Sequence, residues 1–160
     1  MFSEDVSTLV TSTATMKLFE VREDAKQLSE KKGEFFHSVV EKLLFIIKGS
    51  RPNLETAVGL LEKMVLKIDV DDWKILRRIL RFFHFTLKEK RCFGATSLDN
   101  IFTLMDASYA VHHDMKSHTG CLMSMGLGVT HCRFRNQKLN TKSSTEAEIV
   151  RTSDYFPYNI

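Results

Sequence analysis

The apolar residues between positions 34 and 88 recur at helical spacing, and this pattern limits the fold more than any other feature of the chain. Residues three and four positions apart lie on the same face of a helix, so each run describes an amphipathic helix. One run ends at Gly49, a second follows Pro52, and a third begins near Asp71. Glycine is common just past a helix end, and a first helical turn tolerates proline. The spacing therefore predicts three short helices packed together.

The second half of the chain contains short apolar runs that are separated by glycine and polar residues. Residues 101–108, with the sequence IFTLMDAS, predict a mostly buried strand. Residues 121–126 and 129–134 predict two further strands joined by a short turn, and helical spacing returns over residues 143–155. We predict an α+β fold in which three helices precede a three-stranded antiparallel sheet plus one helix.

These patterns divide the chain of 160 residues into successive parts. Residues 1–32 are mostly polar and predict a weakly structured lead-in with a short helix near residues 25–31. Residues 33–91 form the helical segment and residues 100–160 the second domain. A hydrophobic content of 43% with 27% charged residues is that of a soluble globular protein.

The longest apolar run, residues 43–47, is far shorter than the ~20 residues that a membrane-spanning helix needs. The first ten residues carry acids where a secretory signal carries basic residues. The three cysteines, an odd number without close pair spacing, are typical of reduced thiols. We therefore expect an intracellular protein, in the cytoplasm or the nucleus, with no membrane partner.

A net charge of +3 is mild, so a nucleic-acid partner has to be inferred from where the basic residues cluster. The third predicted helix carries basic residues at spacings that place them along one face, opposite the apolar side. They are Lys74, Arg77, Arg78, Arg81 and Lys88. This row is either an ordinary solvated surface or a contact for a phosphate backbone, where each neutralised phosphate adds salt-sensitive affinity.

Asp71 and Asp72 precede the same predicted helix. Paired aspartates on a hairpin turn hold metal ions in polymerases. Here a helix follows at once, and an aspartate at the helix start with a second acid in the first turn explains both residues. We therefore interpret the pair as helix capping.

Histidines and cysteines in the second half supply the donor atoms that zinc prefers. They are His112, His113, His118, Cys121, His131 and Cys132. Their spacing does not match the paired ligands of a zinc module, and neighbours in a strand, such as His131 and Cys132, point to opposite faces. The pattern therefore disfavours a zinc module.

Glu146 follows Ser143 by three positions, and Glu148 follows Thr145 in the same way, so either acid fits a capping box at a helix start. Asp106 ends an apolar strand, where a charge is costly unless a partner compensates it. If the helix packs against that strand, Asp106 and Glu146 converge on Mg²⁺, which prefers carboxylate oxygens. Spacing alone leaves both alternatives open, capping and metal binding.

Most of these segments resemble one known family. The sequences DASYAVHHDMKSHTG (106–120) and QKLNTKSSTEAEIVRTSDYFPYNI (137–160) are similar to the ribonuclease H region of copia-type LTR retrotransposon Pol polyproteins. The motifs D-A-S-Y-A, K-S-x-T-G and S-S-T-E-A-E occur in the same order as in the family. KLLFIIKGSRPNLETAV and DVDDWKILRRILRFFHFTLK resemble the helical segment that connects the reverse transcriptase palm to the ribonuclease H domain. The resemblance covers almost the whole chain.

The resemblance implies that residues 100–160 are the N-terminal part of a ribonuclease H-like domain, whose catalytic and metal-binding acids match Asp106 and Glu146. Asp114 and Glu148 belong to the family signature but are not among its metal ligands. The implied ancestral reaction is hydrolysis of RNA in RNA–DNA hybrids during reverse transcription. Mg²⁺ is the implied cofactor and an RNA–DNA hybrid the implied partner.

The family's third acid lies on a later strand, beyond Ile160, and its polymerase palm precedes the helical segment, so we expect the isolated chain to be inactive. Without the later strands, residues 101–108 form an exposed apolar edge. We therefore expect marginal stability and self-association through that edge. The alternatives are a nucleic-acid-binding module that uses the basic row and a protein-interaction module that uses the strand edge.

Overall fold

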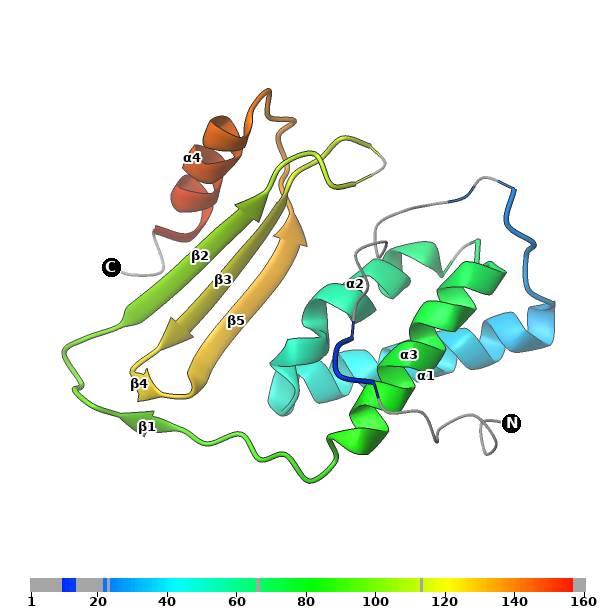
Figure 1. Cartoon of the computed structure of the whole chain (residues 1–160), viewed down its shortest axis with the longest axis horizontal. Coiled ribbons are helices and arrows are strands. Elements are labelled where there is room, and N and C mark those ends of the chain that lie inside the picture. The colour runs from blue at the N-terminus through cyan, green and yellow to red at the C-terminus, as the bar shows by residue number, and fades with distance from the viewer. Residues whose placement is uncertain (1–9, 14–21, 23, 66, 113, 157–160) are drawn as a thin grey trace. The chain divides into compact units, whose positions relative to one another are not determined.

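The computed structural model describes residues 10–13, 22, 24–65, 67–112 and 114–156. The chain divides into two compact units, Met1–Lys90 and Arg91–Ile160. Within the described residues, the first unit contains three α-helices and a short 3₁₀ helix, and the second contains two antiparallel sheets and one α-helix (Figure 1). The predicted combination of helices with antiparallel strands is therefore confirmed.

The helical unit is built from α1 (Glu30–Gly49), the 3₁₀ helix η1 (Pro52–Leu54), α2 (Glu55–Met64) and α3 (Val70–Phe85). The apolar stripes of all three α-helices meet in one core, since burying a large apolar side chain is worth about 1.5–3 kcal/mol. Its fully buried members include Phe36, Val40, Leu54, Val58, Leu61, Leu76 and Ile79. Each helix thus buries its stripe against the other two.

The start of α1 differs from the prediction. The helix begins at Glu30, and the residues before it are not the expected short helix over 25–31. They run extended beside the segment that leads into α3, where Leu28 N donates to Ile68 O at 3.0 Å. Pairing with a distant segment therefore decides the conformation of this stretch, which local helical propensity alone cannot predict.

Arg51, between α1 and η1, is buried with only 8% of its surface exposed. Its Nη1 donates to the carbonyl of Thr86, the residue that caps the C-terminal end of α3, at 2.7 Å. The guanidinium group also lies over the ring of Phe83, 5.3 Å from the centroid. A cation at a helix C-terminus satisfies carbonyls that lack helical partners, so Arg51 fixes the end of α3 beside the start of η1.

The second unit contains a central three-stranded antiparallel sheet in the order β2-β3-β5, a two-stranded sheet of β1 and β4, and α4. The elements are β1 (Gly94–Ala95), β2 (Phe102–Ser108), β3 (His118–Ser124), β4 (Gly126–Leu127), β5 (Val129–Asn136) and α4 (Ser144–Tyr155). The central sheet and the helix confirm the prediction of three antiparallel strands plus one helix. β3 begins earlier and β5 ends later than the predicted strands.

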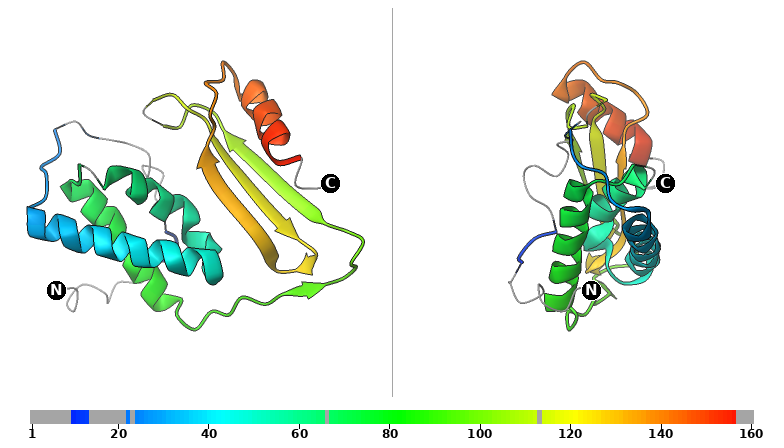
Figure 2. Two further views of the ribbon diagram at one scale, coloured as in Figure 1. Left: turned by 180° about the vertical axis from the view of Figure 1, so that it is seen from behind. Right: turned by 90° about the vertical axis from the view of Figure 1, so that its right-hand side faces the viewer.

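The helix α4 packs on one face of the central sheet, against β2 and β3 (Figure 2). Tyr155 of α4 is fully buried there with Cys121 and Met123 of β3, and Met105 of β2 packs against them. Successive residues of a strand point to opposite faces. The neighbours of Met105 therefore point to the face that α4 does not cover.

β2 was predicted to be mostly buried, and this prediction is wrong. Phe102 is 55% exposed and Leu104 72% exposed, while the alternate residues Thr103, Met105 and Ala107 are partly buried. β2 lies at the edge of the central sheet, and α4 packs on only one of its faces, so every second side chain is exposed. A short apolar run cannot by itself distinguish a central strand from an edge strand, because both can be apolar.

The edge of β2 carries a charged neighbour from α4. Arg151 Nη1 donates to the carbonyl oxygen of Met105 at 2.8 Å. Charged side chains at a strand edge hinder pairing with another chain, so this contact opposes the predicted self-association through β2. The self-association itself stays a prediction. Among the described residues, no helix combines the length and apolar character needed to cross a bilayer.

Candidate functional site

Asp106 lies in β2, and its side chain is exposed. It pairs with Gly120 of β3, which in turn pairs with Phe134 of β5. Since Met105 points towards α4, strand alternation directs Asp106 to the uncovered face. The carboxylate is therefore hydrated, and the predicted cost of a buried charge at the end of this strand does not arise.

Glu146 lies in the first turn of α4 and is also exposed. Its backbone N–H donates to Ser143 Oγ at 3.2 Å, and its Oε2 accepts from the backbone N–H of Lys142 at 2.7 Å. Ser143 is the N-cap, so the capping interpretation of Ser143 with Glu146 is confirmed. Thr145 lies inside the helix, and the alternative cap of Thr145 with Glu148 is wrong.

The segments that carry the two acids lie at the same end of the central sheet. The chain leaves β2 there, and α4 begins there after the connection from β5 (Figure 1). The structure records no hydrogen bond between the carboxylates of Asp106 and Glu146. Over the described ranges, no group of three or more His, Cys, Asp or Glu side chains forms a metal cluster. Joint metal binding by the two acids therefore stays a prediction.

A buried polar network lies at this end of the sheet and joins α4 to β3. Gln137, with 1% of its surface exposed, follows β5 directly. Its Nε2 donates to Thr119 Oγ1 of β3 at 2.8 Å and to the carbonyl of Ala147 in α4 at 2.7 Å. One amide thus connects a central strand to the first turns of the helix that carries Glu146.

A second contact in the network holds the connection before α4. Ser117 and Thr141 are both buried, and their hydroxyl oxygens are 2.8 Å apart. Ser117 Oγ also accepts from the backbone N–H of Ala110 at 3.2 Å, and its carbonyl accepts from Gln137 N–H at 2.8 Å. These bonds bring the β2–β3 loop and the approach to α4 together.

The four residues of this network were not among the predicted site residues. Ser117 and Thr119 are the Ser and Thr of the K-S-x-T-G step, and Gln137 and Thr141 lie in the stretch QKLNT. Both motifs contributed to the family resemblance, and this resemblance was the only sequence feature that pointed to these four residues. Polar residues in short motifs suggest exposed functional groups, but here they are buried and hydrogen-bonded to one another.

The acids at the start of α3 are a capping arrangement, as predicted, although the N-cap is Asp69. Its Oδ1 accepts from the N–H groups of Asp71 and Asp72, and Asp72 Oδ2 accepts from Asp69 N–H at 3.0 Å. Burial raises the pKa of Asp72 to about 6. Hydrogen bonds from Lys74 and Arg22 lower the pKa of Asp71. As the pH rises, the contribution of Asp72 to the free energy of unfolding therefore falls, whereas that of Asp71 rises.

The residues of the predicted basic row have different environments in the structure. Lys74 is exposed, and its Nζ lies 2.8 Å from Asp71 Oδ1. Arg78 is half-buried and donates to Ser12 O and Oγ, each at 3.1 Å. α3 ends at Phe85, so Lys88 lies beyond the helix and does not extend the row along its face. Arg77 and Arg81 are half-buried on α3.

Two of the predicted zinc-type donors come together. His112 Nε2 and His118 Nδ1 are 3.0 Å apart. The other described donors lie elsewhere: Cys121 is buried against α4, and burial raises the pKa of its thiol, which makes it a poor ligand. His131 and Cys132 alternate along β5. His113 lies outside the described residues, and none of the three cysteines forms a disulfide.

Comparison with curated proteins gives distant likenesses that cover about three quarters of the chain. It is 29% identical over 121 residues (74% of the chain) to the retrovirus-related Pol polyprotein from transposon TNT 1-94 of Nicotiana tabacum. It is 26% identical over 118 residues (73%) to secreted RxLR effector protein 161 of Plasmopara viticola. It is 26% identical over 121 residues (74%) to putative transposon Ty5-1 protein YCL074W of Saccharomyces cerevisiae.

The matched segments are very different shares of these relatives. The chain spans 9% of the tobacco Pol polyprotein, 39% of the yeast transposon protein and 83% of the effector protein. No protein-family model matches the chain. No solved structure matches it either.

Substitution of Asp72 by Asn is expected to change how stability depends on pH. The folded pKa of about 6 lies above the ordinary value of 3.8, so the charged carboxylate opposes folding and its contribution to the free energy of unfolding falls as the pH rises through this range. The Asp72→Asn variant should therefore gain stability relative to the parent between pH 4 and 7. Urea unfolding, followed by the fluorescence of the single tryptophan, Trp73, measures this difference.

Asp71→Asn is the matched control, because its pKa is lowered by Lys74 and Arg22. A lowered folded pKa contributes stability above the unfolded pKa, so this variant should lose stability relative to the parent as the pH rises. If the free energy of unfolding depended on pH in the same way in both variants, the opposite pKa shifts of Asp71 and Asp72 would be contradicted.

Substitution of Gln137 by Met should loosen α4 from the sheet. The variant retains a side chain of similar length but leaves Thr119 Oγ1 and the Ala147 carbonyl without this donor. Each buried group so affected costs about 1–3 kcal/mol of unfolding free energy. Amide hydrogen exchange of α4 should become faster, whereas the exposed neighbour Lys138→Met should leave it unchanged. Unchanged protection in Gln137→Met would show that the network does not hold the helix.

Proposed function

Because the chain is related to retrotransposon Pol proteins, we propose that it is a remnant of a copia-type reverse transcriptase/ribonuclease H polyprotein. The helical unit corresponds in this proposal to the connecting segment, and the second unit to the first part of the ribonuclease H domain. The two transposon relatives, each similar over 74% of the chain, are the observation that carries the proposal.

The second unit has features that suit this origin. Asp106 lies in the first strand of its central sheet, and Glu146 lies in the helix that follows the third strand. The segments carrying both acids reach the same end of the sheet (Figure 1). Capping leaves Glu146 exposed, so the same carboxylate can hold the helix start and still reach a hydrated cation.

The chemistry available to the two acids is limited. Mg²⁺ prefers carboxylate oxygens and keeps several waters. Asp106 points to the sheet face that α4 leaves uncovered, so an ion shared with Glu146 has to lie at the end of the sheet that the segments carrying both acids reach. There the two acids can provide part of its coordination. Two-metal hydrolysis of RNA in a hybrid needs further carboxylates to hold both ions around the attacking water and the leaving oxygen. Among the described residues, no larger acidic group joins them. We therefore propose weak Mg²⁺ binding without efficient hybrid cleavage.

Substitution of either acid tests this site. Asp106→Asn and Glu146→Gln should each abolish the weak Mg²⁺ binding of the parent, because each removes a charged ligand. The glutamine retains an oxygen that can accept from Lys142 N–H, so the cap should survive. Titration with Mg²⁺, followed by the backbone amide resonances near positions 106 and 146, measures the affinity.

Glu148→Gln is the control, since Glu148 is exposed on the same helix and is not among the proposed ligands. It should bind Mg²⁺ as the parent does. Equal loss of binding in this variant, or no binding by the parent, would contradict the proposed pair. A cleavage assay on an RNA–DNA hybrid separately tests the expected inactivity.

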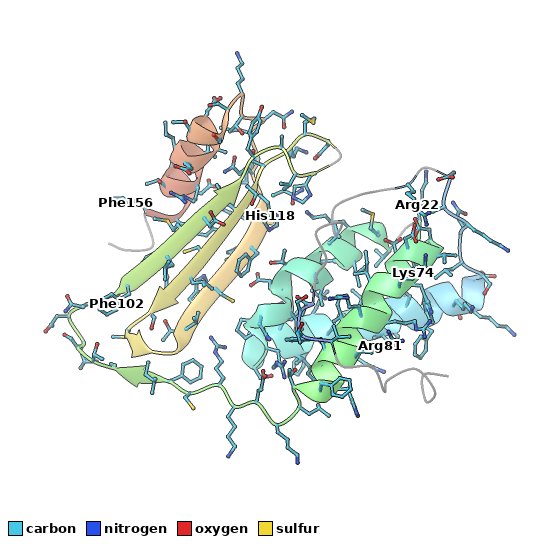
Figure 3. All side chains as sticks on the ribbon, viewed as in Figure 1. Arg22, Lys74, Arg81, Phe102, His118 and Phe156 are labelled. Carbon is cyan, nitrogen blue, oxygen red and sulfur yellow. The ribbon has the colours of Figure 1, made fainter. Side chains whose placement is uncertain are left out.

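A second candidate function is binding of nucleic acid by the helical unit. Lys74, Arg77 and Arg81 follow one another along successive turns of α3, and Figure 3 shows Lys74 and Arg81 on this helix. Arg78 reaches Ser12 instead and so is partly occupied. A row of cations along a helix can bind a phosphate backbone. The contribution of these contacts to the binding affinity decreases as the salt concentration rises.

Replacement of Arg77, Arg78 and Arg81 together by Ala should weaken binding of an RNA–DNA hybrid. The slope of log affinity against log salt should decrease by up to about 2, because Arg77 and Arg81 each account for about one released counterion while Arg78 is held by Ser12. Fluorescence anisotropy of a labelled hybrid at several salt concentrations measures both effects, and Trp73 fluorescence checks that the helical unit is folded.

A variant with Lys31, Lys42 and Lys48 replaced by Ala is the matched control. All three lysines are exposed on α1, and the change in net charge is the same. If this control and the arginine variant lose affinity equally, then general charge and not the α3 row binds the hybrid.

A further inference from the structure

The paired histidines of the second unit lie where the loop after β2 meets the start of β3. His112 has 9% of its surface exposed, and His118 is the first residue of β3. The ring centroids are 5.2 Å apart, with His112 Nε2 and His118 Nδ1 facing each other at 3.0 Å. Figure 3 shows His118 at the end of the sheet where β3 begins. Two ligand-type nitrogens are thus held together by the fold.

The loop that presents His112 has an unusual backbone. Ala110 and Met115 have φ values of +49° and +58°, a left-handed conformation that non-glycine residues adopt only when their surroundings hold them there. Met115 N–H donates to His112 O at 2.8 Å, and His112 N–H donates to Lys116 O at 3.2 Å. The loop is therefore closed around His112, and its ring is placed before a metal arrives.

The separation of the two nitrogens is close to that of two ligands on one metal ion. Zinc binds imidazole nitrogen at ~2.0–2.1 Å with tetrahedral geometry, which places two such ligands about 3.3 Å apart. Opening the pair by a few tenths of an ångström and tilting each ring, so that the two lone pairs converge on one point, would admit the ion. The carboxylate of Asp114, which forms an ion pair with Lys116 Nζ at 2.7 Å, also interacts electrostatically with His112.

We propose that His112 Nε2 and His118 Nδ1 bind a divalent transition metal of the imidazole-preferring class, with zinc as the representative ion. The proton that the two nitrogens share moves to the other nitrogen of the ring that carried it, so both rings stay neutral and both facing lone pairs bind the metal. Within the described part of the chain, no third potential ligand forms a group with them, so water fills the remaining positions. With only two protein ligands, the site binds the ion exchangeably, unlike a structural zinc module.

This inference is independent of the proposed ribonuclease H origin. Magnesium prefers carboxylate oxygens, and zinc prefers imidazole at a site with two histidines. Asp106→Asn should therefore leave zinc affinity unchanged while it removes Mg²⁺ binding. A negative result for the Mg²⁺ site therefore does not refute the zinc site, and a negative result for the zinc site does not refute the Mg²⁺ site.

Zinc chloride titrated into the full chain at pH 7 tests the proposal. Imidazole nitrogen resonances of His112 and His118 in the parent should shift, while those of His131 on β5 should not. His112→Gln and His118→Gln should each lower the zinc affinity in calorimetry by at least about tenfold, and His131→Gln should not. Affinity should also fall between pH 7 and pH 5, because protonated imidazole cannot bind a metal.

The parent spectra require no variant, so they decide the matter even if a substitution unfolds the second unit. Zinc-dependent shifts confined to other histidines would overturn the proposal, as would the absence of any shift. Equal losses of affinity in the His131→Gln control and the two pair variants would overturn it as well.

Discussion

The hydrogen bonds of the Gln137 amide are the interaction on which the second unit most depends. Between the three-stranded sheet and α4 lies a small apolar cluster. Its buried members are Cys121, Met123 and Tyr155, and the partly buried Met105 packs against them. Such a small core positions a helix only loosely, whereas a buried amide that donates to both Thr119 and Ala147 has one acceptable geometry. The network therefore determines where α4 lies on the sheet, and with it the position of Glu146.

The helical unit is organised by a different principle. Its three apolar stripes form a larger core, and the polar contacts lie at the helix ends: Asp69 and Asp72 cap the start of α3, and Arg51 fixes its end. Burial of Asp72 and Arg51 is tolerated because each makes hydrogen bonds to backbone groups that a helix end leaves unsatisfied. Charge in this unit thus serves helix termini, and Arg78 of the basic row is held by Ser12.

Several candidate residues have two compatible roles. Glu146 accepts a hydrogen bond at the helix start and remains exposed, so capping does not remove it from a metal site. Asp106 lies on the sheet face that α4 leaves uncovered, beside Gly120, where an added Cβ would lie 2.7 Å from the Phe134 ring. Without a side chain at Gly120, Phe134 can lie across the strand. The face near Asp106 is thus shaped by an aromatic ring that no motif singled out.

The sequence alone determined the three helices, the antiparallel strands, the helix after them and the cap at Ser143, because these follow from spacing between near neighbours. Tertiary structure decided that β2 has one exposed face, that residues 25–29 are extended, and that Lys88 lies beyond α3. It also brought His112 to His118 and Gln137 to Ala147. These outcomes depend on which distant segments meet, and hydrogen bonds between distant residues leave no periodicity in a single sequence.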